Sequence, residues 1–304
     1  MSITLKNVSL TWQDGTAQAI NALLNVSLHI EDGEFVGIMG QTGCGKSSLI
    51  QAIAGLLPIS EGQILIQDND IHSKSYDKNL LRQTIGIIFQ YPETQLFETT
   101  VEKDVAFGLK YSGLSKAEVT QRVRQALTFM GFIYEDIKRE SPLALSGGEK
   151  RRIAIAGVLA CKPRILILDE PIAGLDPRGR ESFLKLLHKL NKEGTTIIMV
   201  SHNADALSEY AHRILVMENG RILLDDTPNR IFHDIPFMEQ HHLDTSNPCR
   251  ITWLLRQQGI HLSKEAVSYD SFLHSLVSHC TAIGNENPIE NRKAVTADEI
   301  PPDR

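Results

Sequence analysis

A glycine-rich segment near the N-terminus has the composition of a phosphate-binding loop. It fits the pattern GxxxxGK[ST] and consists of Gly40, Gln41, Thr42, Gly43, Cys44, Gly45, Lys46 and Ser47, followed by Ser48. A short apolar run precedes the segment, and an apolar pattern of helical spacing follows it as far as Gly55. Glycines let successive backbone N–H groups turn toward an anion, and the following helix adds its positive N-terminal end. We therefore expect Lys46 to reach the β- and γ-phosphates of a nucleotide and the Ser47 hydroxyl to bind Mg²⁺.

Two adjacent carboxylates, Asp169 and Glu170, come directly after four aliphatic residues at 165–168. An acidic pair at the end of a strand is often only a solvated turn. In a chain that also contains a phosphate loop, such a pair is typical of a nucleotide hydrolase. We expect Asp169 to hold the metal ion, directly or through water, and Glu170 to polarise the water that attacks the γ-phosphate.

Two further polar residues, Gln90 and His202, each end an apolar run. A lone histidine in such a place is more often structural than catalytic, and a lone glutamine indicates very little. The apolar run before His202 follows the one before Asp169, which favours a contact between the imidazole and the γ-phosphate. The position of Gln90 favours a contact with Mg²⁺ or with the attacking water.

A second glycine-rich turn lies at residues 145–149, which read LSGGE. Ser146, Gly147, Gly148 and Glu149 lead into a basic and then apolar stretch, so they form a second anion site at the start of a helix. One nucleotide cannot easily use both phosphate sites of one chain. A head-to-tail pair solves this problem, because each chain then presents its LSGGE turn to the nucleotide of the other.

The surrounding pattern predicts an α/β fold. Short apolar runs at 35–39, 64–66, 85–89, 165–168 and 196–200 are rich in β-branched residues, and stretches of helical spacing lie between several of them. This alternation is typical of a largely parallel sheet covered by helices. Residues 1–30 read as two strands separated by a polar turn near Asp14. Ser115 and Glu118 form a capping-box pattern, which predicts a helix over 115–131.

Composition excludes several other classes of protein. The chain has 304 residues, of which 42% are hydrophobic and 22% charged, as in an ordinary globular protein. Its net charge of −6 disfavours general nucleic-acid coating. The four cysteines lie far apart, which favours a reduced chain without structural zinc. We expect no signal peptide, and no apolar run approaches the ~18–20 residues of a membrane span.

Taken together and in this order, these motifs resemble an ABC-type ATPase over roughly residues 1–228. Residues 173–176, which read AGLD, complete the set. The resemblance implies a P-loop ABC ATPase fold: a RecA-like parallel sheet core, an antiparallel β subdomain and a helical signature subdomain at about 91–160. It also implies ATP and Mg²⁺ held in a dimer, hydrolysis promoted by Glu170 and His202, and signalling between the two sites through Asp176. Trp12 stands where this family stacks an aromatic ring on adenine, although a half-buried strand aromatic is the alternative.

Two positions depart from the family pattern. Glu149 stands where glutamine is more usual, and Ile172 stands where threonine is more usual. Neither change removes a group assigned to chemistry, and both leave the rate of hydrolysis open.

Residues 89–97 and 100–108 narrow the resemblance to the ATPases of energy-coupling factor (ECF) importers, with their cobalt and nickel relatives. Details of these segments resemble the second of two paired, non-identical ATPases, and residues 151–160 agree. In that family a groove beside Gln90 receives helices of a transmembrane scaffold, for which Leu96, Phe97, Val101 and Phe107 are candidates. Residues 229–280 resemble the C-terminal helical dimerisation extension of these ATPases, and a simple helical cap is the alternative.

The resemblance implies the motor subunit of an importer for a vitamin, a metal ion or another micronutrient. Its partners would be a second ABC ATPase or a second copy of the chain, a transmembrane scaffold and a substrate-binding membrane subunit, with no nucleic acid. It would work as a peripheral protein at the cytoplasmic face of the cell membrane. The alternatives are the ATPase of a conventional ABC transporter, a homodimeric cobalt or nickel importer, and a soluble ABC ATPase that acts on ribosomes or DNA.

The last segment, 281–304, has no aromatic residue, three prolines and five acids. This composition predicts a disordered tail.

Overall fold

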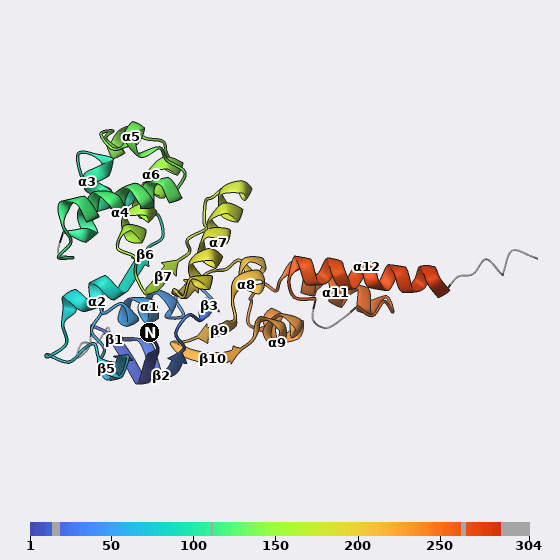
Figure 1. Cartoon of the computed structure of the whole chain (residues 1–304). Helices are drawn as coiled ribbons and strands as arrows, with labels where there is room; N and C mark the ends of the chain where they lie inside the picture. The colour runs from blue at the N-terminus through green and yellow to red at the C-terminus, as the bar shows by residue number, and fades with distance from the viewer. Residues whose placement is uncertain (14–18, 111, 263–265, 287–304) are drawn as a thin grey trace, which may run out of the picture.

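The computed structural model describes residues 1–13, 19–110, 112–262 and 266–286, and Figure 1 shows two sheets with helices around them. The smaller sheet has the strand order β2-β1-β4-β5 and is antiparallel. Its strands are β1 (Ile3–Trp12), β2 (Ile20–Ile30), β4 (Glu61–Ile66) and β5 (Asn69–Asp70). The polar turn expected near Asp14 lies outside the described residues.

The larger sheet has the strand order β10-β9-β3-β8-β7-β6. Its strands are β3 (Phe35–Gly40), β6 (Ile85–Ile88), β7 (Ile165–Asp169), β8 (Thr196–Val200), β9 (Arg213–Glu218) and β10 (Arg221–Asp226). All pairs except β9 with β10 are parallel, and every residue of β3 and β8 is buried. Because parallel strands end at the same edge of a sheet, the segments after β3, β6, β7 and β8 gather at one edge. Three helices follow strands of this sheet: α1 (Lys46–Ile53), α7 (Pro177–Lys192) and α8 (Ala204–Tyr210).

A separate helical lobe stands above the sheets in Figure 1. Its α-helices are α3 (Val101–Ala106), α4 (Lys116–Phe129), α5 (Tyr134–Ile137) and α6 (Gly147–Ala160). The predicted helix over 115–131 is confirmed as α4: the Ser115 hydroxyl accepts from the N–H of Glu118, and the Glu118 carboxylate accepts from the N–H of Ser115. Such a reciprocal cap satisfies backbone donors that would otherwise be unpaired.

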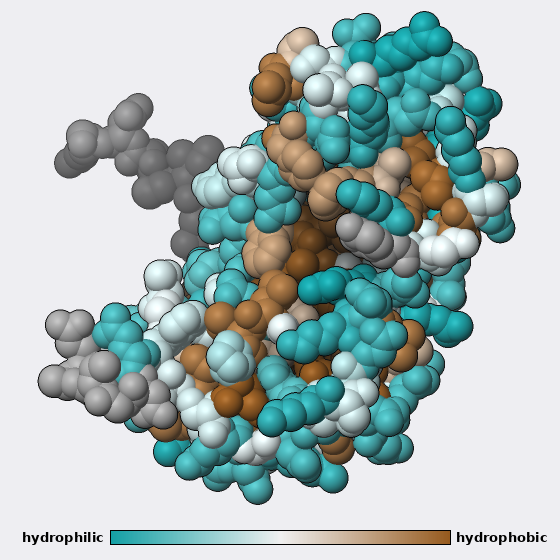
Figure 2. Space-filling view, turned by 90° about the vertical axis from the view of Figure 1, so that its left-hand side faces the viewer, coloured by the Kyte–Doolittle hydropathy of each residue, from teal (hydrophilic) through white to brown (hydrophobic). Residues whose placement is uncertain are grey.

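Hydrophobic side chains gather in the hollow between the helical lobe and the sheet core, as Figure 2 shows. Large apolar side chains are exposed on both parts of the molecule: Leu80 on α2 (Lys78–Thr84), and Phe97 and Phe107 in the lobe. Contiguous exposed apolar surface usually marks an interaction site in soluble proteins.

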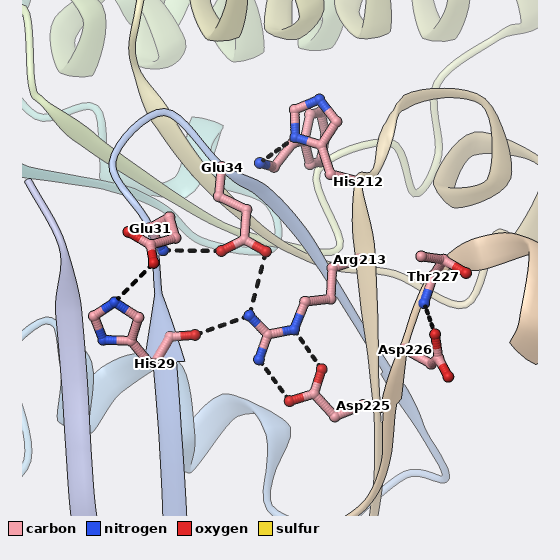
Figure 3. A network of polar contacts seen from close by, with 9 residues as sticks. His29, Glu31, Glu34, His212, Arg213, Asp225, Asp226 and Thr227 are labelled. Atoms are coloured by element: carbon pink, nitrogen blue, oxygen red, sulfur yellow. Dashed lines mark hydrogen bonds and ion pairs between the residues drawn. The ribbon is translucent and has the colours of Figure 1, made fainter.

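Arg213, the first residue of β9, joins the two sheets (Figure 3). Its guanidinium donates to the backbone oxygen of His29 on β2 at 2.9 Å and lies 3.3 Å from a carboxylate oxygen of Glu34. Asp225 on β10 accepts two further bonds from the same group. These bonds to Asp225 raise the pKa of Arg213, so the guanidinium stays charged and holds the edge of one sheet against the other.

The described part of the chain after β10 contains the helices α9 (Pro228–His233), α10 (Ile235–Gln240), α11 (Asn247–Gln257) and α12 (Tyr269–Glu286). The helix α11 starts at Asn247, and Ser246 caps it by accepting from the N–H of Cys249. On α11, Ile251 and Leu254 are 40% and 52% exposed. The helix α12 continues to Glu286, and residues 287–304 of the predicted tail lie outside the described part.

Within the described residues, no helix combines the length and the apolar character needed to cross a membrane.

Candidate functional site

A cavity of about 590 Å³ lies at the edge of the large sheet where β3, β6, β7 and β8 end. It brings together eleven of the residues that the sequence predicts for the nucleotide site: Trp12, Thr42, Gly43, Gly45, Lys46, Ser47, Ser48, Gln90, Asp169, Glu170 and His202. Three other predicted residues, Gly40, Gln41 and Cys44, do not line it. Residues distant in sequence thus share one space because the strands that carry them are parallel neighbours.

Two positions of the phosphate loop require glycine, because the backbone of other segments lies very close to them. Gly40 has a φ of +150°, and a Cβ there would lie 2.3 Å from the carbonyl oxygen of Met217. Gly45 has a φ of +107°, and a Cβ there would lie 2.4 Å from the carbonyl oxygen of Ala22. Any larger residue would displace backbone at both positions, so these glycines fix how tightly the loop turns.

Lys46 is folded back onto its own loop. Its Nζ donates to the carbonyl oxygens of Gly40 at 2.6 Å and Gln41 at 2.8 Å, and the residue is only 7% exposed. The buried Cys44 thiol lies 3.9 Å from the same Nζ. The carbonyls therefore hold the ammonium group at the mouth of the loop, where it can exchange these partners for phosphate oxygens.

The side chains predicted to bind Mg²⁺ lie together in this cavity. The Ser47 hydroxyl donates to Oδ2 of Asp169 at 2.9 Å, and Gln90 lines the same cavity. A hydroxyl, a carboxylate and an amide are the oxygen ligands that Mg²⁺ accepts. These three side chains fit a magnesium ion that completes its shell with water and phosphate oxygens.

Glu170 is held in an unusual backbone conformation, with a φ of +47°. Its N–H donates to the carbonyl oxygen of Val200 at 3.0 Å, so β8 fixes the residue in place. Burial and the neighbouring Asp169 raise the pKa of its carboxyl to about 7, against the opposing effect of Lys46. A carboxyl with a pKa near 7 can take a proton from water at neutral pH, which suits a general base.

His202 lies beside this carboxyl. Its Nε2 is 3.6 Å from Oε1 of Glu170, and its side chain is 53% exposed. Burial and the charge of Lys46 lower the pKa of His202, while Asp244 raises it. The lowered pKa favours the neutral imidazole at pH 7.

Arg151, on α6 of the helical lobe, reaches the turn that follows Glu170. It is 6% exposed and donates to the carbonyl oxygens of Pro171 and Ala173, the latter at 2.9 Å. The N–H of Ala173 donates in turn to the carbonyl oxygen of Glu170 at 3.2 Å. A charged donor that bridges two carbonyls makes this turn rigid. Arg151 follows one basic residue and precedes another, so this role is not visible in the sequence.

The LSGGE turn borders a different cavity, also of about 590 Å³, between α6 and α7. Ser146, Gly148, Glu149 and Asp176 line it, whereas Gly147 does not. Asp176 caps α7 by accepting from the N–H of Gly179 at 2.6 Å. None of these residues lines the cavity of the phosphate loop. The phosphate loop and the LSGGE turn therefore border two separate cavities.

The structure shows how Glu149 and Ile172, the two residues that depart from the family pattern, are accommodated. Oε2 of Glu149 accepts from the hydroxyl of Ser146 at 2.6 Å and from its N–H at 2.9 Å, and these bonds lower the pKa of the Glu149 carboxyl. The acid thus completes a capping box at the start of α6. Ile172 is 3% exposed and packs in the main hydrophobic core.

Five residues that line the nucleotide cavity were missed by the sequence reasoning: Ile20, Asn21, Ala22, Ala173 and Val200. The first three belong to β2, whose Ile20 pairs with Trp12 across the antiparallel sheet. Strand pairing with Trp12 is the signal that could have found them. The Trp12 side chain is 44% exposed at the cavity, so a face of its ring is available for stacking.

Comparison with known proteins identifies the family. The family model described as ABC transporter matches residues 23–173, a span from β2 to the turn after Glu170. Two curated relatives, each an energy-coupling factor transporter ATP-binding protein EcfA2, come from Clostridium acetobutylicum and Streptococcus pneumoniae. They are 45% and 41% identical to this chain over 89% and 91% of its length, and over 95% and 99% of their own. The chain belongs to the energy-coupling factor ATPases of the ABC transporter family.

Solved structures agree with this ECF ATPase assignment. The structure of cbiO1 from Clostridium perfringens, described as part of the ABC transporter complex cbiONQ, is 37% identical, with a TM-score of 0.68 over 84% of this chain and 98% of that one. A dimeric ATP-binding cassette in a post-hydrolysis state bound to ADP and Pi is 32% identical, with a TM-score of 0.66 over 74% and 98%. The predicted P-loop ABC ATPase fold is thereby confirmed, and ATP is the nucleotide of this family.

One candidate scaffold contact of this ECF ATPase was wrong. Val101 is fully buried, because it is the first residue of α3 and packs into the core of the lobe. Phe97 and Phe107 remain accessible at 62% and 49%, and their rings meet edge to face with centroids 4.8 Å apart. Leu96 is partly buried against the core. Of the four candidates, Phe97 and Phe107 are the two that are exposed.

Proposed function

We propose that this chain is the ATP-binding and hydrolysing motor subunit of an ECF-type importer, which couples ATP hydrolysis to uptake of a micronutrient. One observation carries the proposal: the chain has a complete phosphate-loop half-site and a separate LSGGE half-site that share no lining residue. A single nucleotide cannot join them within one chain. Two chains placed head to tail can each supply one half to each of two ATP molecules.

In this arrangement ATP enters the cavity of Lys46, whose Nζ leaves the loop carbonyls for the β- and γ-phosphates. Ser47, Asp169 and Gln90 would hold Mg²⁺, which supplies positive charge at the phosphates when bound. Ser146 of the partner subunit then meets the γ-phosphate, and the dimer closes.

Hydrolysis follows from the geometry around Glu170. Its carboxylate accepts a proton from the attacking water, and the rigid turn held by Arg151 keeps the carboxylate aimed at the γ-phosphate. The neutral imidazole of His202 lies beside it and donates a hydrogen bond to the γ-phosphate. After phosphate is released the dimer opens, because the contacts that closed it depended on that phosphate.

In an importer, the movement that this cycle produces must be transmitted to a membrane partner. The exposed Phe97–Phe107 pair lies in the helical lobe, and such exposed apolar side chains suit the apolar face of a scaffold helix. Closure moves the lobe relative to the sheet core and carries such a helix with it. On this proposal the chain is a peripheral subunit at the cytoplasmic face of the cell membrane, bound to a transmembrane scaffold and a substrate-binding membrane subunit.

We also propose the division of the chain into an ABC-type nucleotide-binding domain at 1–228 and a C-terminal dimerisation extension at 229–280. The exposed apolar residues Ile251 and Leu254 on α11, with Leu273 and Val277 on α12, support a contact there with the partner ATPase.

Isolation of the tagged chain from its own membranes in mild detergent tests the importer assignment. We expect a second ABC ATPase, a scaffold and small membrane subunits to be recovered with it. The Phe97→Ser/Phe107→Ser double variant should lose the scaffold and keep the second ATPase. Recovery from the cytosol alone, with ribosomal or DNA-bound partners, would refute the transport role.

A homodimeric cobalt or nickel importer is the second candidate. The likeness to cbiO1, which is part of the cbiONQ complex, favours it. The same isolation separates the two candidates, because a homodimeric importer would yield this chain and a scaffold without a second ATPase.

A further inference from the structure

The C-terminal extension is bonded directly to the phosphate loop. Nε2 of Gln41 donates to the backbone carbonyl of His241 at 3.0 Å, so this side chain points away from the nucleotide cavity. The imidazole of His241 lies 3.0 Å from Oε1 of Glu218 at the end of β9, and its ring packs on Phe237 of α10. His241 is thereby fixed to both the sheet and the extension.

A second connection reaches the segment after His202. Asp205 is the second residue of α8, and both of its carboxylate oxygens accept bonds from the extension. Oδ1 accepts from the backbone N–H of Asn247 at 2.7 Å, and Oδ2 accepts from its side-chain amide at 2.5 Å. The Tyr269 hydroxyl donates to Oδ2 at 3.3 Å and accepts from the Asn247 amide at 3.2 Å.

These partners stand at the start of two helices. Asn247 is the first residue of α11 and Tyr269 the first of α12. A carboxylate at a helix N-terminus is stabilised by the free N–H groups and the helix dipole. Asp205 therefore joins the beginnings of α8, α11 and α12, which lie together in Figure 1.

Hydrogen bonds hold the short segment between His202 and Asp205 in place. Between them, Asn203 caps α8 by accepting from the N–H of Ala206 at 2.7 Å, and its own N–H donates to the Ser201 hydroxyl at 3.1 Å. Ser201 is fully buried. Since α8 also packs on α9 and α11, a displacement of the extension must move the start of α8 and the adjoining histidine.

We propose that Asp205 is a positioning residue for the hydrolysis reaction: it binds the C-terminal extension to the His202 segment, so that the place of α11 and α12 sets the place of the His202 imidazole beside Glu170. The inference rests on the proposed role of His202 at the γ-phosphate. It gives the extension a role inside its own chain, besides any contact with a partner. When a partner binds the exposed helices of the extension and shifts them, the position of His202 and therefore the rate of hydrolysis would change.

The test compares Asp205→Ala with wild type in the full chain, purified together with the subunits that accompany it. We expect kcat to fall about tenfold, since a displacement of about 1 Å at a reacting group can cost up to a hundredfold. The KM for ATP should stay within twofold, because Lys46 and its loop are untouched. Arg230→Ala is the matched control: it removes an exposed ion pair between Arg230 of the extension and Asp226 on β10, and kcat should not change.

A double-mutant cycle with His202→Ala separates positioning from general weakening of the fold. In the His202→Ala background, whose residual rate is measured at higher protein concentration, Asp205→Ala should cause no further loss. An equal tenfold loss in both backgrounds, or an unchanged kcat in Asp205→Ala alone, would overturn the proposal. If His202→Ala itself leaves kcat unchanged, the proposed role of His202 is what fails.

Should Asp205→Ala not fold, Tyr269→Phe removes only one of the bonds to the carboxylate. It should lower kcat by a smaller factor, again only when His202 is present. A Tyr269→Phe loss that persists without His202 contradicts the proposal in the same way.

Discussion

The raised pKa of Glu170 predicts that removal of its charge stabilises the nucleotide-free protein. The carboxyl is only 18% exposed and lies beside Asp169, which is why its pKa rises from 4.5 to about 7. A group whose pKa is raised on folding contributes stability below its unfolded pKa and loses it as the pH rises through the folded value. Wild type therefore weakens between about pH 4.5 and 7, whereas Glu170→Gln does not titrate in this range.

The magnitude follows from the shift. One pKa unit corresponds to about 1.4 kcal/mol, so the full penalty at pH 8 is about 3 kcal/mol. The remaining solvent contact of the side chain reduces this figure, and we expect a gain of about 2 kcal/mol for Glu170→Gln at pH 8. For domains of ~150–250 residues this corresponds to a rise in Tm of ~4–8 °C. At pH 4.5 the gain should nearly vanish, because the wild-type carboxyl is then protonated.

Thermal unfolding of both proteins without nucleotide, at pH 4.5, 6 and 8, measures the effect. Glu181→Gln is the matched control, since Glu181 is 62% exposed and pairs with Lys185 at 2.6 Å; it should bring no gain in Tm at pH 8. A Tm difference for Glu170→Gln that is the same at all three pH values would refute the reasoning, because ionisation would then not be its cause.

Three other predictions concern the site and its connections. Lys46→Ala should abolish ATP binding, because no other cation of the loop replaces its Nζ; nucleotide affinity measured by fluorescence checks this, and unchanged affinity contradicts the phosphate-loop assignment. Arg151→Met should lower the free energy of unfolding by about 2–4 kcal/mol and also lower kcat, since two backbone carbonyls lose a charged donor. In the same denaturation experiment the exposed neighbour variant Arg152→Met should cost less than about 1 kcal/mol. Phe97→Ser should leave the ATPase rate of the isolated chain unchanged and weaken its recovery with a membrane scaffold, and equal recovery would exclude Phe97 from that contact.

Much of the fold follows from local sequence patterns. The capping box of Ser115 and Glu118 specifies the start of α4, and Ser246 likewise specifies the start of α11. These interactions span three residues, so spacing alone determines them. The polar composition after residue 280 does not mark the end of a helix, and α12 continues to Glu286.

Several features of the site could not be read from the sequence. Val101 fits an apolar contact surface in the sequence, but its helix turns it into the core of the lobe. Gln41 belongs to the phosphate-loop motif, but its side chain bonds to His241, 200 residues later. The burial of Val101 and the bond of Gln41 depend on which helices and strands pack against one another. The spacing of residues in the sequence does not specify that packing.

The sequence by itself determined the kind of chemistry, because a phosphate loop, the pair Asp169–Glu170 and the LSGGE turn each act through residues that are neighbours in the chain. The tertiary structure alone decided that the pKa of Glu170 lies near 7 and that Asp205 joins α8 to two distant helices. Burial and long-range hydrogen bonds arise only when the chain has folded, since both depend on atoms that folding brings from elsewhere in the sequence.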